Sequence, residues 1–119
     1  MGKIIGYARV ANSDSDIEVQ KTALRAAGST QIFDDIGSGR LPGLAEALAT
    51  LSLGDTLVVS DLSRLSRSST HRLEIIDGLH QRGIFLRSLR EEVDTAHDPN
   101  PMTFRLERFM EGVYAESPK

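Results

Sequence analysis

Short apolar runs of strand length alternate along this chain with segments of helical periodicity, and this alternation restricts its fold more than any other feature. Four runs have the length and apolar character of strands buried on both faces of a sheet: residues 3–7, 31–33, 56–60 and 84–86. Strands of this kind are typical of parallel sheets, because the helical crossovers between parallel strands cover both faces.

Apolar residues at helical spacing lie between these runs. One stripe consists of Leu44, Leu48 and Leu51, and a second of Leu73, Ile76 and Leu79. Alternating strand and helix predicts an α/β fold of three layers, in which helices flank a central, mostly parallel sheet of four or more strands. We expect one compact domain over residues 1–100, continued by a C-terminal helix over residues 101–119.

Composition excludes several classes of site. The chain has no cysteine, and its three histidines, His71, His80 and His97, lack the i, i+4 spacing of a helical zinc pair. We therefore expect no metal and no cofactor. No run approaches the roughly 20 apolar residues that span a bilayer, and the N-terminus does not read as a signal peptide. We accordingly expect a cytoplasmic protein with no membrane partner.

Charged side chains stand close to the predicted strand ends. Arg9, Asp35 and Arg64 lie near three of these ends, and ligands of parallel sheets bind where the carboxyl ends of the strands gather. The planar fork of arginine suits this position, because it gives two aligned hydrogen bonds to a phosphate. A net charge of -3 argues against a free-standing DNA binder but allows a local basic pocket.

Several motifs follow one another in a known order. Residues 6–11 read Gly-Tyr-Ala-Arg-Val-Ala, and residues 62–67 read Leu-Ser-Arg-Leu-Ser-Arg. They resemble the Gly-Tyr-x-Arg-Val-Ser and Leu-Asp-Arg-Leu-x-Arg motifs of the serine site-specific recombinases, the resolvase and invertase family. Between them, the helical segment 17–27 with its glutamine, a Phe-x-Asp element at 33–35 and the Ser-Gly at 38–39 resemble further family elements in the same order.

The resemblance implies a catalytic domain that cleaves a DNA crossover site and exchanges strands through a phosphoseryl intermediate. By resemblance, the scissile phosphate would be held by Arg9, Arg64 and Arg67, with Arg40 as a further candidate whose spacing is shifted. Accessory site residues would be Gln20, Asp35 and Ser38. The helix-turn-helix domain that usually supplies sequence-specific affinity in this family is not expected in this chain.

Two positions depart from the family pattern. Ala11 stands where the family has its nucleophilic serine, and a methyl group has no lone pair with which to attack phosphorus. Ser63 replaces the aspartate of the second motif. We therefore expect a recombinase domain that is inactive as written, with a natural and an introduced Ala11 both open. Ser13, Ser15 or Ser63 as a displaced nucleophile is a minor alternative, because small misplacements are costly.

The C-terminal segment carries a continuous apolar seam at spacings of four, three and four: Met102, Leu106, Phe109 and Val113. This seam fits a terminal helix packed on its own sheet or a helix that pairs with a second copy. The family resemblance favours a homodimer, which would change to a tetramer during strand exchange. Two other hypotheses stay open: a non-catalytic relative that dimerises and regulates an active recombinase, and a binding module without affinity for DNA.

Overall fold

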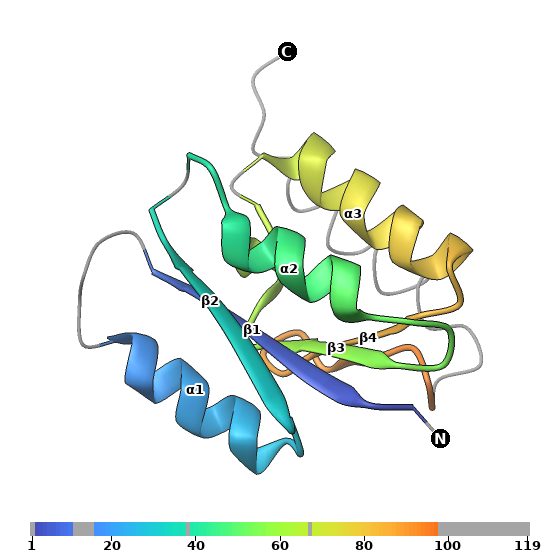
Figure 1. The fold of residues 1–119 in the computed structure, drawn as a ribbon, viewed down its shortest axis with the longest axis horizontal. Coiled ribbons are helices and arrows are strands. Elements are labelled where there is room, and N and C mark those ends of the chain that lie inside the picture. The colour runs from blue at the N-terminus through green and yellow to red at the C-terminus, as the bar shows by residue number, and fades with distance from the viewer. Residues whose placement is uncertain (1, 11–15, 38, 67, 98–119) are drawn as a thin grey trace.

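The computed structural model describes residues 2–10, 16–37, 39–66 and 68–97, and within them strands and helices alternate (Figure 1). In chain order the elements are β1 (Ile4–Val10), α1 (Asp16–Ala26), β2 (Gln31–Ile36), α2 (Pro42–Thr50), β3 (Thr56–Val59), the short 3-10 helix η1 (Leu62–Arg64), α3 (Ser69–Gln81), β4 (Phe85–Ser88) and β5 (Val93–Asp94).

The strands form one sheet in the order β2-β1-β3-β4-β5. The pairs β1–β2, β1–β3 and β3–β4 are parallel, and only β4–β5 is antiparallel. The predicted α/β fold with a mostly parallel sheet is therefore confirmed. The short edge strand β5 was not predicted, because two residues give no apolar run that periodicity can detect.

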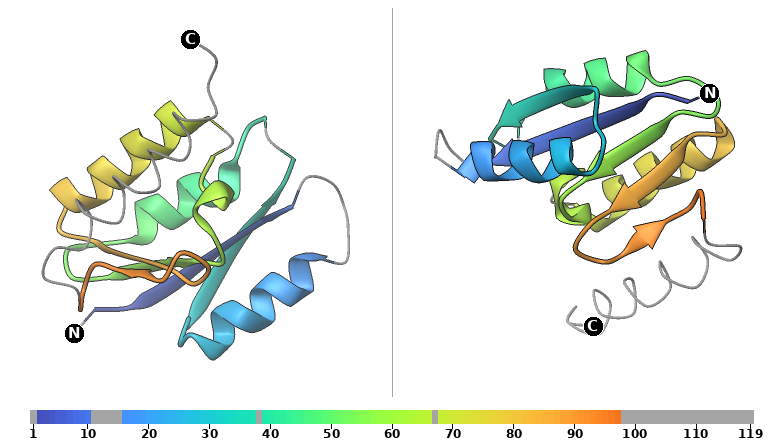
Figure 2. Two further views of the ribbon diagram at one scale, coloured as in Figure 1. Left: turned by 180° about the vertical axis from the view of Figure 1, so that it is seen from behind. Right: turned by 90° about the horizontal axis from the view of Figure 1, so that it is seen from below.

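Helices cover both faces of the sheet (Figures 1 and 2). On one face α2 and α3 pack over the larger core, which includes Ile5, Tyr7, Leu57, Val59, Leu44, Ala47, Ile76 and Leu79. On the other face α1 packs through Leu24 against Ala8 of β1 and Val58 of β3. The chain thus has the three layers that the sequence predicts, with β1 and β3 in the interior of the sheet.

Strand β1 is longer than expected. The sequence predicts its end at residue 7, but the ladder with β2 continues through Arg9 opposite Asp35 and Val10 opposite Ile36. The prediction was short because the apolar run stops at Tyr7, whereas β2 extends to Ile36 and offers further backbone partners. Arg9 consequently lies inside the strand rather than in the loop after it.

Candidate functional site

Two arginines meet at the carboxyl end of the sheet. Arg9 is the second-last residue of β1, and Arg64 closes η1, directly after the neighbouring strand β3. From β1 the chain leaves to opposite sides, first to β2 and later to β3, so the sheet order changes direction between β1 and β3. Open α/β sheets bind their ligands at such a switch point, outside the carboxyl ends of the strands.

The Arg9 side chain is buried, with 6% of its surface exposed. Its Nε donates to the carbonyl oxygen of Arg64 at 3.0 Å, Nη1 to that of Gly37 at 3.1 Å, and Nη2 to that of Ser63 at 2.8 Å. One guanidinium therefore ties the end of β1 to the turn after β2 and to the loop after β3. Burial of this charge is tolerable because each of its nitrogens has a carbonyl partner.

The Arg64 side chain is more open, with 28% of its surface exposed. Its Nη1 donates to the carbonyl oxygen of Arg9 at 3.0 Å, and its Nε pairs with the Asp61 carboxylate at 3.1 Å. No hydrogen bond among the described residues engages Nη2. A guanidinium held in this way has an edge left to donate to an oxyanion.

Gln20 of α1 fastens the end of β1 from the other side. It is buried, its Oε1 accepts the N–H of Arg9 at 3.1 Å, and its Nε2 donates to the carbonyl oxygen of Arg9 at 2.9 Å. The predicted accessory residue thus contacts the site, but through the backbone of Arg9. Only an amide can do this, because it offers a donor and an acceptor together.

Asp35 points away from the two arginines. This buried carboxylate accepts the N–H groups of Gly43 and Leu44 at the start of α2, each at 2.8 Å, and the hydroxyl of Tyr7 at 2.6 Å. It therefore caps α2, where a negative charge also favours the helix dipole. Burial of the Tyr7 hydroxyl and its bond to Asp35 raise the pKa of this phenol far above its usual value.

Ser63 and Asp61 form a pair that the sequence reasoning did not find. Ser63 is exposed, and both its N–H, at 3.1 Å, and its hydroxyl donate to Oδ1 of the buried Asp61. Asp61 thereby caps η1 while its Oδ2 holds Arg64. A capping residue just before a turn was the available signal, but the motif drew attention to Ser63 alone.

Two further side chains support residues 61–66, hereafter the β3 loop. Glu91 accepts the N–H of Leu62 at 3.2 Å and the hydroxyl of Ser88. Arg72 of α3 donates from Nη1 to the carbonyl oxygen of Ser66 at 2.7 Å. Burial lowers the pKa of Arg72, and the nearby charges of Glu91 and Asp61 oppose this effect. The β3 loop is thus held from α3, from the β4–β5 turn and from β1.

The other predicted site residues are not brought into this cluster. Arg40 is exposed in the turn before α2. Ala11, Ser38, Arg67 and the seam Met102, Leu106, Phe109 and Val113 lie outside the described residues. In the described part of the chain, no helix is long and apolar enough to cross a membrane, and no group of three or more acidic or histidine side chains is placed to hold a metal ion.

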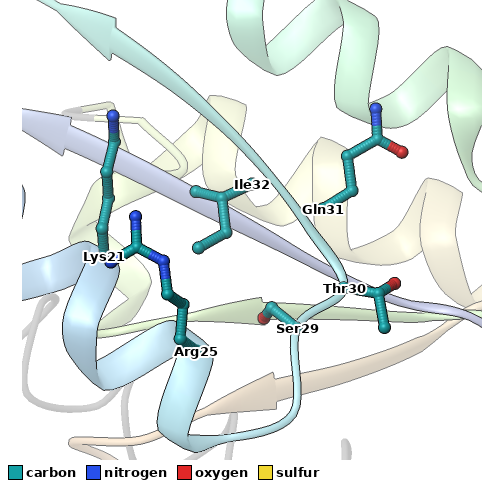
Figure 3. Close-up of a pocket in the computed structure, with 6 residues that line it drawn as sticks. All are labelled: Lys21, Arg25, Ser29, Thr30, Gln31 and Ile32. Atoms are coloured by element: carbon teal, nitrogen blue, oxygen red, sulfur yellow. The ribbon is translucent and has the colours of Figure 1, made fainter.

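A shallow pocket of about 350 Å³ lies between the end of α1 and the start of β2 (Figure 3). Its lining includes Lys21 and Arg25 of α1 and Gln31 of β2. Lys21 is already paired, because its Nζ lies 2.7 Å from Oδ2 of Asp34. Since β2 begins here, the pocket lies at the amino end of this strand, away from the end where Arg9 and Arg64 meet.

Comparisons with known proteins agree on one family. A family model described as "Resolvase, N terminal domain" matches residues 4–116. The serine recombinase gin of Escherichia phage Mu is 46% identical over 96 residues, which cover 78% of this chain and 50% of the relative. The DNA-invertase hin of Salmonella typhimurium is 43% identical over 95 residues, which cover 77% and 50%. The chain spans about half the length of these curated relatives.

Solved structures show the same fold. The N-terminal catalytic domain of TP901-1 integrase aligns with a TM-score of 0.71 at 26% identity and covers 95% of each chain. A resolvase family site-specific recombinase from Streptococcus pneumoniae aligns with a TM-score of 0.62 at 18% identity and covers 98% of this chain and 93% of the other. At that identity the second likeness concerns the fold alone.

Proposed function

We infer, because the chain belongs to the resolvase N-terminal domain family, that it serves as the catalytic-domain part of a serine site-specific recombinase and holds a phosphate of its DNA crossover site at Arg64. The partners of this function would be DNA and a second copy of the chain, since strand exchange needs more than one cleaving domain. Which recombination outcome follows is a property of the whole protein.

One observation carries the phosphate assignment: the Arg64 guanidinium is fixed at Nε and Nη1 while its Nη2 edge stays open at the switch point of the sheet. Such an edge is prepared for an oxyanion, because the guanidinium is positioned before the ligand arrives. Arg9 would act differently. Its nitrogens donate to three backbone carbonyls, so its part would be to position Arg64 and the β3 loop.

Cleavage would need the nucleophile that position 11 lacks. A serine hydroxyl there would attack phosphorus, form the phosphoseryl bond and release the DNA oxygen, with its proton passing to a base. The methyl group of Ala11 offers neither a lone pair nor a proton. We therefore expect the chain to bind crossover DNA without cutting it.

A covalent-trapping assay tests this function. The parent chain, Ala11→Ser and Ala11→Ser with Ser63→Asp are each fused to the helix-turn-helix domain of a related recombinase and mixed with crossover-site DNA. We expect a covalent adduct from at least one restored protein and none from the parent. A further Arg64→Ala change should abolish the adduct. Absence of any adduct from both restored proteins would contradict the catalytic ancestry of this site.

DNA affinity is a second, simpler readout. Arg64→Ala should weaken binding of a labelled duplex by about 5- to 50-fold and reduce the salt slope by about one, as expected for loss of one phosphate contact. Arg25→Ala is the matched control, because Arg25 is an exposed arginine on α1 that lies away from the site. Equal losses in both variants would show that charge alone, and not this site, binds DNA.

The burial of Arg9 favours a second function. With 6% of its surface exposed and three carbonyls bound, Arg9 offers little to a phosphate. A non-catalytic relative that pairs with an active recombinase and regulates it would need no more than this. It would dimerise through Met102, Leu106, Phe109 and Val113 and would form no adduct even with the nucleophile restored. Sedimentation of the parent and of Leu106→Asp would test the pairing.

A further inference from the structure

Asp61 occupies a position that none of the motifs assigns. Its carboxylate is buried, yet both its oxygens are used: Oδ1 accepts from Ser63, and Oδ2 lies 3.1 Å from Nε of Arg64. The motif that this loop resembles carries an aspartate at position 63, directly before the arginine. Here position 63 is a serine that donates to a carboxylate two residues earlier.

We propose that Asp61 is the positioning residue of Arg64, and that it supplies to the β3 loop the carboxylate that Ser63 lacks. The inference rests on the proposed function insofar as Arg64 binds phosphate. Asp61 holds Nε, the backbone of Arg9 holds Nη1, and together they fix the plane of the guanidinium with Nη2 outward. A fixed plane matters because a two-point contact with a phosphate needs both donors aligned.

Asparagine distinguishes this role from a merely structural one. Asn caps a helical turn about as well as Asp, so Asp61→Asn leaves the cap of η1 with Ser63 in place. Its single amide oxygen, however, cannot accept from Ser63 and Arg64 as two carboxylate oxygens do, and its NH₂ group repels the Nε–H of Arg64. A cap would survive this change, whereas the orientation of Arg64 would not.

The same geometry makes a specific statement about restoring the motif. Ser63→Asp alone removes the hydroxyl that donates to Asp61 and places a second carboxylate beside the first, so the two repel each other. Moving the carboxylate, by Asp61→Ser together with Ser63→Asp, avoids this conflict and returns the loop to the family pattern. The swap should therefore work where the single restoration fails.

The experiment measures binding of the labelled crossover duplex by the parent chain, Asp61→Asn, Ser63→Asp, the swap and Arg64→Ala. We expect about 5- to 10-fold weaker binding for Asp61→Asn, a larger loss for Ser63→Asp, and recovery to within about twofold of the parent for the swap. Thermal unfolding of each variant confirms that the fold is kept. The side-chain Nε–H signal of Arg64 in an NMR spectrum gives a readout that needs no DNA.

The outcomes separate the two hypotheses. If binding depends on Arg64 but Asp61→Asn binds as the parent does, or if the Arg64 Nε–H exchanges with water equally fast in both, the positioning role is overturned and the proposed function stands. If Arg64→Ala binds as the parent does, the proposed function fails and the positioning role fails with it. Weaker binding and faster Nε–H exchange in Asp61→Asn, with both recovered in the swap, support the inference.

Discussion

Arg9 and Arg64 each donate a hydrogen bond to the backbone carbonyl of the other. Nε of Arg9 lies 3.0 Å from the carbonyl oxygen of Arg64, and Nη1 of Arg64 lies 3.0 Å from that of Arg9, although 55 residues separate them in the sequence. This reciprocal pair joins the end of β1 to the β3 loop, and it makes the shape of the site depend on both side chains at once.

Replacement of Arg9 should cost more stability than replacement of an exposed arginine. Arg9→Ala leaves three carbonyl oxygens, those of Gly37, Ser63 and Arg64, without their donor. We expect a loss on the order of 3 kcal/mol in the free energy of unfolding, since unpaired buried polar groups are expensive. Urea denaturation measures it. Arg25→Ala, at an exposed position, should stay within about 0.5 kcal/mol of the parent, and similar losses in both would refute the bracing role.

Two glycine-to-alanine changes should act in opposite directions. A Cβ at Gly43, in the first turn of α2, would lie 2.1 Å from the carbonyl oxygen of Asp34, so the helix must shift away from β2. We expect Gly43→Ala to cost about 1–3 kcal/mol or more. Gly78 of α3 has no atom within 4 Å of such a Cβ, and Gly78→Ala should stabilise the protein by about 0.5–1 kcal/mol. Melting temperatures that move in the same direction would contradict this account.

The phenol of Tyr7 should make the protein sensitive to alkali. Burial and the bond to Asp35 raise its pKa in the folded state above the ordinary 10.0, so the unfolded chain loses this proton first. The stability that the neutral phenol contributes is present below pH 10 and is lost as the pH rises further. Tyr7→Phe should cost about 1–3 kcal/mol at neutral pH through the lost bond to a carboxylate.

The difference between these two proteins should shrink above pH 10, because phenylalanine has no proton to lose. Urea midpoints of the parent and Tyr7→Phe between pH 7 and 11 measure it. The other tyrosine, Tyr114, is common to both proteins and does not affect the comparison. A difference that stays constant over this range would show that the Tyr7 phenol ionises in the folded state as easily as in the unfolded chain.

Asp55 should make the protein sensitive to acid. Its carboxylate accepts the N–H groups of Lys3 and Ser52, both at 2.8 Å, and these bonds lower its pKa below the usual 3.8. The unfolded chain therefore takes up this proton first, so the contribution is present above about pH 4 and is lost as the pH falls through the folded-state pKa. Asp55→Asn should unfold with a shallower dependence on pH below 4, measured by circular dichroism. Equal slopes would rule the contribution out.

The sequence predicts the fold well because apolar periodicity records burial directly. The run at 56–60 became β3 and the stripe through Leu44 became α2, each within a residue or two of the expected position. The stripe on α3 was less simple. Leu79 and Ile76 are buried as expected, but the charged Arg72 is buried beside them, because it reaches the backbone of Ser66. Periodicity counts apolar side chains and cannot anticipate a paired cation.

The site was predicted in its position but not in its contacts. The motifs led to Arg9 and Arg64, and parallel topology was enough to bring them together. The direction of each side chain was beyond the sequence. Asp35 stands in β2 opposite Arg9, yet its carboxylate is taken by the start of α2. Asp61 went unnoticed because its contact with Arg64 depends on the turn of η1 and not on spacing in a motif.

The three acceptors of Arg9 are carbonyl oxygens, which every residue possesses. The side chain at position 63 can therefore change in the course of evolution without weakening the grip of Arg9 on the β3 loop. Selection for a foldable protein does not detect such a change, and only selection for activity does. In this lineage the architecture of the site can thus persist long after its reactive groups have been exchanged, and its presence marks descent more reliably than it marks a working enzyme.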